Sequence, residues 1–209
     1  MDLQLRLRRE GGHQLPVLLW RFPKAMRAVA SAPHGGGLGS RRWVVNAQVP
    51  PSYGRRDPDH HLAKLAVSLG LPGKGVGLMT AADVRAYWSG MDGGVEVVAT
   101  VGLSTPTLAA APPDPRPLSL VGTINIVAAV PERLSDAGLV NMVATVTEAK
   151  AQALGDAGLQ ATGTPTDAVC IVCPDEGSTH NFGGPRSTWG ARLARAVHQA
   201  VLMGAGRRC

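Results

Sequence analysis

Residues 121–130 read VGTINIVAAV, and this stretch is the strongest strand signal in the chain. Its residues are β-branched or small and apolar, apart from Thr123 and Asn125. A short apolar run of this kind predicts a buried β-strand. Two uncharged polar side chains inside a buried strand are either structural or part of a binding site, and the rest of the sequence bears on that choice.

Short strands and a few helices surround this stretch. Strict alternation in LQLRLR indicates a half-buried strand, and apolar residues at helical spacing indicate helices. Ser135 is a good N-cap for the best of these helices, with an apolar stripe at Leu139, Val143, Val146 and Ala153. Strands are predicted at 3–8, 16–22, 26–32, 41–49, 75–80, 95–103, 120–130 and 167–173, and helices at 60–69, 81–90, 135–155 and 187–204.

This pattern predicts an α/β or α+β fold: a single domain, residues 1–209, with a mostly mixed β-sheet core flanked by three to four helices. The Pro-rich residues 109–118 are interpreted as an extended surface loop, because strand-like sequence resumes at once. Hydrophobic residues make up 44% and charged residues 17%, which is ordinary for a globular protein.

The compartment is predicted from the same composition. No apolar stretch reaches the roughly 18 residues of a membrane span, and the first residues lack the apolar region of a signal peptide. Three cysteines cannot all pair with one another within one chain. We therefore expect a cytoplasmic protein without a membrane partner, and a homo-oligomer is compatible with the sequence.

Charge is unevenly distributed. Residues 1–56 carry ten basic and two acidic side chains, a net +8, and residues 57–209 carry a net −2. A basic face can bind nucleic acid. The arginines are, however, scattered singly, without interleaved aromatic residues or a known DNA-binding spacing, so a solvated basic surface is the better interpretation and no nucleic-acid partner is predicted.

The usual catalytic and metal-binding motifs are weak or absent. Cys170 and Cys173 are three residues apart on a predicted strand and should point to opposite faces, so they are interpreted as buried apolar residues. The six histidines show no metal-ligand spacing, and no metal is predicted. The glycine-rich stretches 34–40 and 72–77 complete no phosphate-binding motif and are expected to be tight turns.

Polar residues recur at the ends of otherwise apolar strands. A sheet edge of threonine, asparagine and one aspartate, with little net charge, suits a ligand rich in amides and hydroxyls. The alternative is that threonine simply favours strands, and asparagine and aspartate favour turns. On the long helix, Asn141, Thr145 and Glu148 are expected to form a solvated face opposite the apolar stripe. The strand-end residues are Asn46, Thr80, Gly122, Thr123, Asn125, Thr164, Thr166 and Asp167.

Several segments together resemble the CbiZ family of adenosylcobinamide amidohydrolases. They are ASAPHGGGL, WVVNAQVPPSY, GVGLMTAADV, ATVGL, VGTINIVAAV, LVNMVATVTEAKAQAL and TGTPTDAVCIV, in this order, followed by a final helix. The resemblance covers roughly residues 26–203. It implies hydrolysis of the amide between aminopropanol and the corrin ring of adenosylcobinamide, giving adenosylcobyric acid and 1-aminopropan-2-ol in cobinamide salvage. It implies no cofactor, because cobalt belongs to the corrinoid substrate.

The chain departs from the family pattern at two places. A histidine often follows the late Gly-Gly pair, where this chain has Gly183-Gly184-Pro185-Arg186. Pro165 also interrupts what is more usually a flexible Gly-Thr-Gly-Thr turn. If that histidine takes part in catalysis in relatives, another group must replace it here.

Amide hydrolysis needs a nucleophile, proton transfer and a donor for the oxyanion. We predict Thr123 as nucleophile or water-positioning group, Asp167 or Glu148 for proton transfer, and Gly122 backbone with the Asn125 amide at the oxyanion. The substrate-binding residues are predicted to be Asn46, Thr80, Gly122, Asn125, Thr164 and Thr166.

Two alternatives stay open at this stage. Gly122-Thr123 followed by a strand resembles, over about forty residues, the self-cleavage junction of the ornithine acetyltransferase and β-peptidyl aminopeptidase group, in which a new N-terminal threonine or serine is the nucleophile. The chain could also be a non-catalytic corrinoid-binding salvage protein that uses the same polar strand ends.

Overall fold

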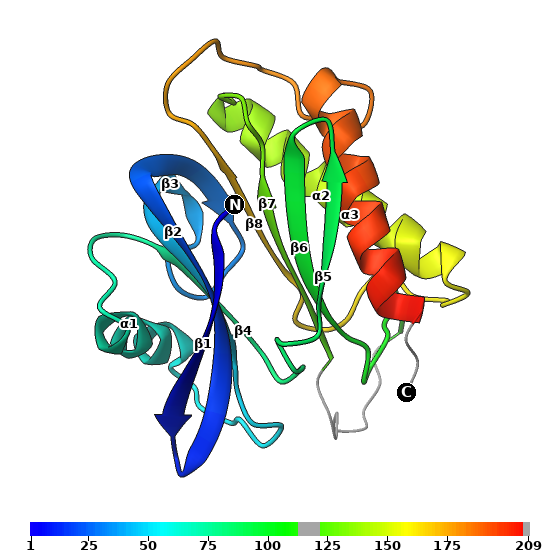
Figure 1. The fold of residues 1–209 in the computed structure, drawn as a ribbon. Helices are drawn as coiled ribbons and strands as arrows, with labels where there is room; N and C mark the ends of the chain where they lie inside the picture. Colours follow the sequence, from blue (N-terminus) through cyan, green and yellow to red (C-terminus); the bar gives the residue numbers. More distant parts are fainter. Residues whose placement is uncertain (113–121, 207–209) are drawn as a thin grey trace.

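The computed structural model describes residues 1–112 and 122–206, and Figure 1 shows their arrangement. Eight strands form one mixed sheet, with three helices among the described residues. This confirms the predicted fold class. In chain order the elements are β1 (Leu3–Glu10), β2 (His13–Ala30), β3 (Gly37–Gln48), α1 (Pro58–Ser68), β4 (Val76–Thr80), β5 (Tyr87–Asp92), β6 (Val95–Gly102), β7 (Thr123–Ala129), α2 (Asp136–Asp156), β8 (Ala168–Cys173) and α3 (Thr188–Gly206).

The sheet follows the order β4-β3-β2-β8-β7-β6-β5, and β1 pairs with β2 outside this path. β2 is a single 18-residue strand where two strands were predicted. Its register against β3 shifts between Arg21 and Met26, in a segment that contains Pro23. This irregularity bends the strand, because proline removes a ladder donor and a bulge increases the local twist. β2 therefore pairs with β1 along its first half and with β8 at its end.

The sheet folds over on itself, so that its two halves face each other across a core. The side chains of Leu18, Val44 and Leu78 from one half pack in one cluster with Val127 and Cys170 from the other. α1 covers the outer face of β2 and β3, and α2 with α3 covers the outer face of β6, β7 and β8. Figure 1 shows α1 on one outer side and α2 with α3 on the other.

β7, which lies within the VGTINIVAAV stretch, is buried on both faces. Ile124, Ile126 and Ala128 pack against α2 and α3, whereas Val127 faces the core between the two halves of the sheet. Thr123 and Asn125 share the face of Val127, because side chains alternate along a strand. The two polar residues of β7 therefore point toward the β1–β4 half of the molecule.

One further prediction about local structure needs correction. The predicted helix at 81–90 is instead a turn followed by β5, which pairs with β6. Here pairing with a neighbouring strand outweighs weak local helix propensity. Part of the predicted Pro-rich loop at 109–118 lies outside the described residues.

The helix ends follow the predicted capping. The Ser135 side chain accepts a hydrogen bond from the Gly138 N–H, and the Ser187 hydroxyl accepts one from the Gly190 N–H. None of the three described helices combines the length and hydropathy needed to cross a bilayer.

Candidate active site

A cavity of about 580 Å³ lies where the two halves of the sheet meet. Its volume is within the range of small-molecule sites. Polar groups of the β7 and β8 region line one part of it, and a proline-rich apolar wall lines another. The polar lining residues are Ser31, Tyr53, Thr80, Ser104, Thr123, Asn125, Thr166 and Asp167, and the others are Pro33, Val49, Pro50, Pro51, Pro58, Met79, Ala81, Ala82, Gly102 and Ala168.

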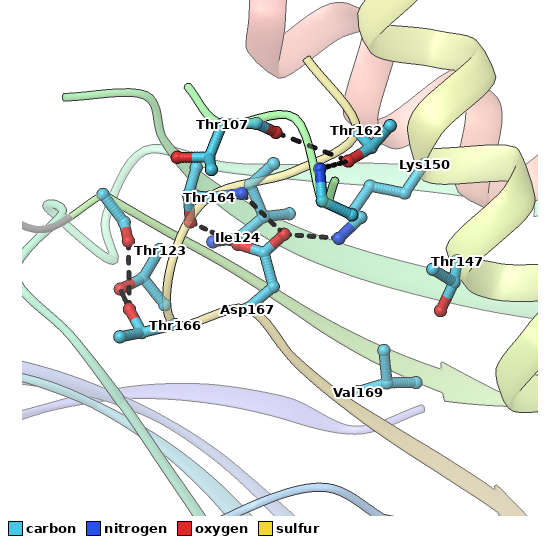
Figure 2. A network of polar contacts seen from close by, with 12 residues as sticks. Thr107, Thr123, Ile124, Thr147, Lys150, Thr162, Thr164, Thr166, Asp167 and Val169 are labelled. Carbon is cyan, nitrogen blue, oxygen red and sulfur yellow. Dashed lines mark hydrogen bonds and ion pairs between the residues drawn. The ribbon is translucent and has the colours of Figure 1, made fainter. Parts of the chain in front are cut away.

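Thr123 and Thr166 are brought together by strand pairing. β7 and β8 are parallel and place Asn125 beside Ala168, so the residues two positions earlier also lie side by side. The two hydroxyl oxygens are 2.6 Å apart, and Thr166 donates to the Gly122 carbonyl oxygen at 3.0 Å. Figure 2 shows both threonines beside the Asp167 cluster.

Counting hydrogens fixes the direction of this chain of hydrogen bonds. A carbonyl oxygen can only accept, so the single Thr166 hydroxyl hydrogen is directed to Gly122. The Thr123 hydroxyl must then donate to the Thr166 oxygen. Among the described residues no group donates to Thr123 Oγ1, so its lone pairs are available to a ligand in the cavity, as a nucleophile requires.

Gly122 is required at this position by space. A Cβ atom there would lie 2.7 Å from the Gly102 carbonyl oxygen, on the neighbouring strand β6. A side chain at residue 122 would therefore push the start of β7 away from β6. This is a steric reason for the glycine of VGTIN, and it does not depend on an oxyanion role.

Asp167 has no free hydrogen-bonding position, although it lines the cavity. Its Oδ1 accepts from the Ile124 N–H at 2.8 Å and from the Thr164 hydroxyl, and its Oδ2 accepts from the Thr164 N–H at 3.0 Å and from Lys150 Nζ. Four donors occupy the roughly four lone-pair positions of a carboxylate. The geometry therefore favours a positioning role over the predicted proton transfer, since Asp167 fastens residue 164 and the start of β7 around Thr123 (Figure 2).

Lys150 is the site residue that the sequence interpretation missed. It lies on α2 with 8% of its surface exposed and pairs with Asp167, whose side chain is 11% exposed. A nearly buried lysine needs such a partner. The signal was present in VTEAK, because residue 150 continues the stripe Leu139, Val143 and Val146 at helical spacing, so a lysine there must be buried against the sheet.

Gly163 makes room for this ion pair. A Cβ atom at residue 163 would lie 2.3 Å from Asp167 Oδ2 and 2.6 Å from Lys150 Nζ. The TGTPTD segment thus includes a glycine for space, and Thr164, Thr166 and Asp167 for hydrogen bonds. Thr164 binds Asp167 and does not line the cavity.

Asn125 is fixed by a buried polar network between the two halves of the sheet. Its Nδ2 donates to the Met79 carbonyl at 3.0 Å and to Asn46 Oδ1 at 2.9 Å, and Asn46 Nδ2 donates to Thr100 Oγ1 at 3.0 Å. Both N–H groups of Asn125 are used, which argues against the predicted oxyanion role. Its Oδ1 is the atom left to accept a hydrogen bond from a ligand.

The other predicted site residues fall in different places. Thr80 lines the cavity, and its hydroxyl accepts from the Ala82 N–H. Asn46 is buried behind Asn125 and supports it without lining the cavity. Glu148 is exposed on α2 and is not a lining residue, so the structure does not bring it to Thr123.

The predicted solvated face of α2 is wrong at Thr145, whereas Asn141 and Glu148 are exposed as predicted. Thr145 is buried and donates to the Gly183 carbonyl at 2.8 Å, and Asn141 Oδ1 accepts from the Gly183 N–H at 3.1 Å. The segment at residues 183–186, where a histidine was expected in relatives, packs against α2 and does not line the cavity. The tertiary fold covers a helix face that sequence periodicity left exposed.

The cysteines are unsuited to nucleophilic catalysis. Cys170 faces the core between the two halves of the sheet, and Cys173 faces α2 and α3, as their spacing predicted. Burial raises the pKa of the Cys170 thiol to about 12 and also raises the pKa of Cys173. Cys209 lies outside the described residues. Among the residues that are described, no three histidine, cysteine or carboxylate side chains gather closely enough to hold a metal ion.

Comparison with known sequences bears on the identity of this site. The sequence model of CbiZ, adenosylcobinamide amidohydrolase, matches residues 2–209. A Methanosarcina mazei protein named adenosylcobinamide amidohydrolase is 28% identical over 178 residues, 81% of this chain and 85% of that protein. A Halobacterium salinarum protein of the same name is 42% identical over 117 residues, 52% of this chain and 49% of that protein. The chain belongs to the CbiZ family of adenosylcobinamide amidohydrolases.

Proposed function

We propose that this protein hydrolyses the amide between aminopropanol and the corrin ring of adenosylcobinamide, releasing adenosylcobyric acid and 1-aminopropan-2-ol. The observation that carries the proposal is the placement of Thr123, in the VGTIN segment of a CbiZ-family chain, with its oxygen lone pairs directed to a cavity. The reaction returns scavenged cobinamide to coenzyme B12 synthesis. Its cytoplasmic location, the lack of a resident cofactor and the lack of a nucleic-acid partner stay predictions.

The two parts of the cavity wall suit the two parts of a corrinoid. Pro33, Pro50, Pro51 and Met79 offer apolar contact for ring faces, while Thr123 and the Asn125 Oδ1 lie among the polar groups. A corrin ring with its upper ligand is larger than the 580 Å³ cavity, so the aminopropanol arm enters and the ring lies at the opening. Asn125 Oδ1 would accept the N–H of the scissile amide and orient its carbonyl toward Thr123.

In the proposed first step, Thr123 Oγ1 attacks the carbonyl carbon of the scissile amide. The hydroxyl proton leaves for a base, the amide nitrogen takes a proton, and the C–N bond breaks to release 1-aminopropan-2-ol. The corrinoid is then held as an ester on Thr123. Water hydrolyses this ester to adenosylcobyric acid and restores the threonine.

The source of the base separates two versions of this proposal. Asp167 has all four positions occupied, so it can accept a proton only by releasing a donor. In the first version the chain is uncut, and a carboxylate such as Asp167 takes the Thr123 proton. In the second version the chain is cut before Thr123, and the new α-amine is the base, as in N-terminal threonine hydrolases.

The hydrogen-bond directions around Gly122 suit the self-cleaving version. Thr123 Oγ1 would attack the Gly122 carbonyl carbon while its proton passes to Thr166 and the Thr166 proton passes to the Gly122 oxygen. The tetrahedral centre then breaks its C–N bond, and its hydroxyl proton moves to the nitrogen. Water hydrolyses the ester and leaves chains 1–122 and 123–209.

A product assay combined with intact mass tests the proposal. Purified protein is incubated with adenosylcobinamide, and adenosylcobyric acid is separated by chromatography and identified by mass. Product formation is expected. Tight binding without product would contradict the enzyme assignment and leave a corrinoid-binding protein. If the active protein is a single uncut chain, self-cleavage is excluded. If it consists of two fragments, residues 1–122 and 123–209, the uncut version is excluded.

A further inference from the structure

A second polar chain begins at the cavity wall and is not used by the proposed reaction. Tyr53 lines the cavity, in the loop between β3 and α1. Its hydroxyl lies 2.9 Å from Nδ1 of His61 on α1, and Nε2 of His61 lies 2.7 Å from Glu10 at the end of β1. We call these three residues the tyrosine relay.

The histidine of the relay is held firmly between its two partners. His61 is 7% exposed, and its ring stacks on the Tyr53 ring with centroids 5.5 Å apart. The other Glu10 oxygen accepts from Arg8 at 3.1 Å, and Arg8 is itself held by the Gln48 carbonyl at 2.7 Å.

Counting hydrogens again fixes the direction of the relay. With Glu10 ionised, Nε2 of a neutral His61 carries the hydrogen and donates to the carboxylate, so Nδ1 is an acceptor. The single Tyr53 hydroxyl hydrogen then points to His61. The Tyr53 oxygen can therefore only accept a further hydrogen bond.

We propose that Tyr53 is a substrate-recognition residue, set by His61 and Glu10 as a hydrogen-bond acceptor for an N–H or O–H group of the corrinoid arm. This inference rests on the proposed function, since it assumes that the arm occupies the cavity. Primary amides of the corrin edge and the hydroxyl of aminopropanol both supply such a donor. His61 and Glu10 are positioning residues, because they act through Tyr53.

The relay also discriminates substrate from product. The product carries a carboxylate in place of the secondary amide and has lost the aminopropanol hydroxyl. An oxygen that can only accept gives no hydrogen bond to a carboxylate, so Tyr53 favours the amide over the acid. The expected consequence is that the Tyr53 hydroxyl strengthens substrate binding more than product binding.

Tyr53→Phe is the central test, with Tyr87→Phe as its matched control. Tyr87, the other tyrosine of the chain, is on β5 and does not line the cavity. Loss of one neutral hydrogen bond should raise KM for adenosylcobinamide about fivefold with kcat nearly unchanged, and should leave inhibition by adenosylcobyric acid unchanged. Tyr87→Phe should behave like the wild-type protein.

The outcomes separate this inference from the proposed function. No turnover by the wild-type protein would overturn the proposed function. Turnover with the same KM in Tyr53→Phe would overturn the relay alone. Nitrogen NMR of His61 gives a test that needs no activity: a hydrogen on Nε2 near neutral pH is expected, and a hydrogen on Nδ1 would contradict the acceptor assignment of Tyr53. His61→Gln should raise KM as Tyr53→Phe does, and Tyr53→Phe remains decisive if that variant does not fold.

Discussion

Two polar clusters at the base of the cavity use similar side chains but differ in how many hydrogen-bonding positions they leave open. Around Asp167, Lys150 and Thr164, every carboxylate position is occupied by a donor. Around Thr123 and Thr166, the hydrogens are used, while no donor within the described part of the chain occupies the lone pairs of Thr123. A cluster whose hydrogen-bonding positions are all occupied (a closed cluster) holds the chain in place, whereas one with unoccupied positions (an open cluster) can react. Residue type alone therefore does not identify the catalytic group.

Removing the Thr123 hydroxyl should have the largest effect on activity. Thr123→Ala is expected to lower kcat by at least about a thousandfold, as loss of a nucleophile does, while the free energy of unfolding changes by less than about 1 kcal/mol. Steady-state kinetics and chemical denaturation measure the two quantities. The matched control is Thr147→Ala, because Thr147 is exposed on α2 and its hydroxyl binds only the Val143 carbonyl.

Near-normal turnover by Thr123→Ala would show that this hydroxyl only holds the ligand. Thr123→Ser keeps the hydroxyl and should keep measurable activity. If the chain is self-cleaved, Thr123→Ala should also remain a single chain by mass, whereas Thr123→Ser should still be cut.

Breaking the cluster around Asp167 should mainly lower the stability of the fold. Asp167→Asn leaves the buried Lys150 ammonium without a counter-charge, and breaking a buried ion pair from one side costs about 3–5 kcal/mol of unfolding free energy. Chemical denaturation measures this loss. Glu148→Gln is the control, because the Glu148 carboxylate is exposed. This variant should change stability by less than about 0.5 kcal/mol and leave kcat unchanged.

A different result for Asp167→Asn would reverse the comparison of the two clusters. If stability hardly changes while kcat collapses, Asp167 transfers a proton and is not a positioning residue. A collapse of kcat in Glu148→Gln would restore the role that its sequence position suggested.

Removing the Thr166 hydroxyl, which links the two threonines, should have an intermediate effect on activity. Thr166→Val keeps the shape of the side chain but removes the acceptor of the Thr123 hydrogen. We expect kcat to fall about 10- to 100-fold with KM little changed, because orientation of the nucleophile is lost while the cavity is kept. A rise in KM at constant kcat would instead assign Thr166 to ligand binding.

Blocking thiols should have the smallest effect. With the pKa of Cys170 raised to about 12, only about one thiol in ten thousand is ionised at pH 8, and Cys173 is fully buried. A Cys209→Ser variant treated with iodoacetamide should show no modified cysteine by mass and full activity. Two modified cysteines should appear after unfolding, and rapid modification of folded protein would contradict the burial.

Local features were predictable from sequence where neighbouring residues decide them. The Ser135 cap, the apolar stripe of α2 and the opposite faces of Cys170 and Cys173 follow from helix and strand periodicity. The turn and strand at residues 81–92 were missed because β5 is stabilised by pairing with β6, which no local propensity reports.

The candidate site was predictable only in part. The TEAK segment was recognised as significant, but its glutamate was chosen and its lysine overlooked, although residue 150 continues the buried stripe of α2. Asn125 lines the cavity, but the use of both its N–H groups depends on Met79 and Asn46, which come from the other half of the sheet.

By itself, the sequence determined that the VGTINIVAAV stretch holds a buried strand, Thr123–Ala129, with Thr123 and Asn125 on one face, because strand periodicity is a local property. It also determined the resemblance to the CbiZ family, which the match over residues 2–209 confirms. Only the tertiary structure decided which polar group stays open. The parallel pairing of β7 with β8 and the folding of the sheet place Thr166, Lys150 and Asn46 around these residues, and hydrogen-bond partners far apart in the chain determine which lone pairs remain for a substrate.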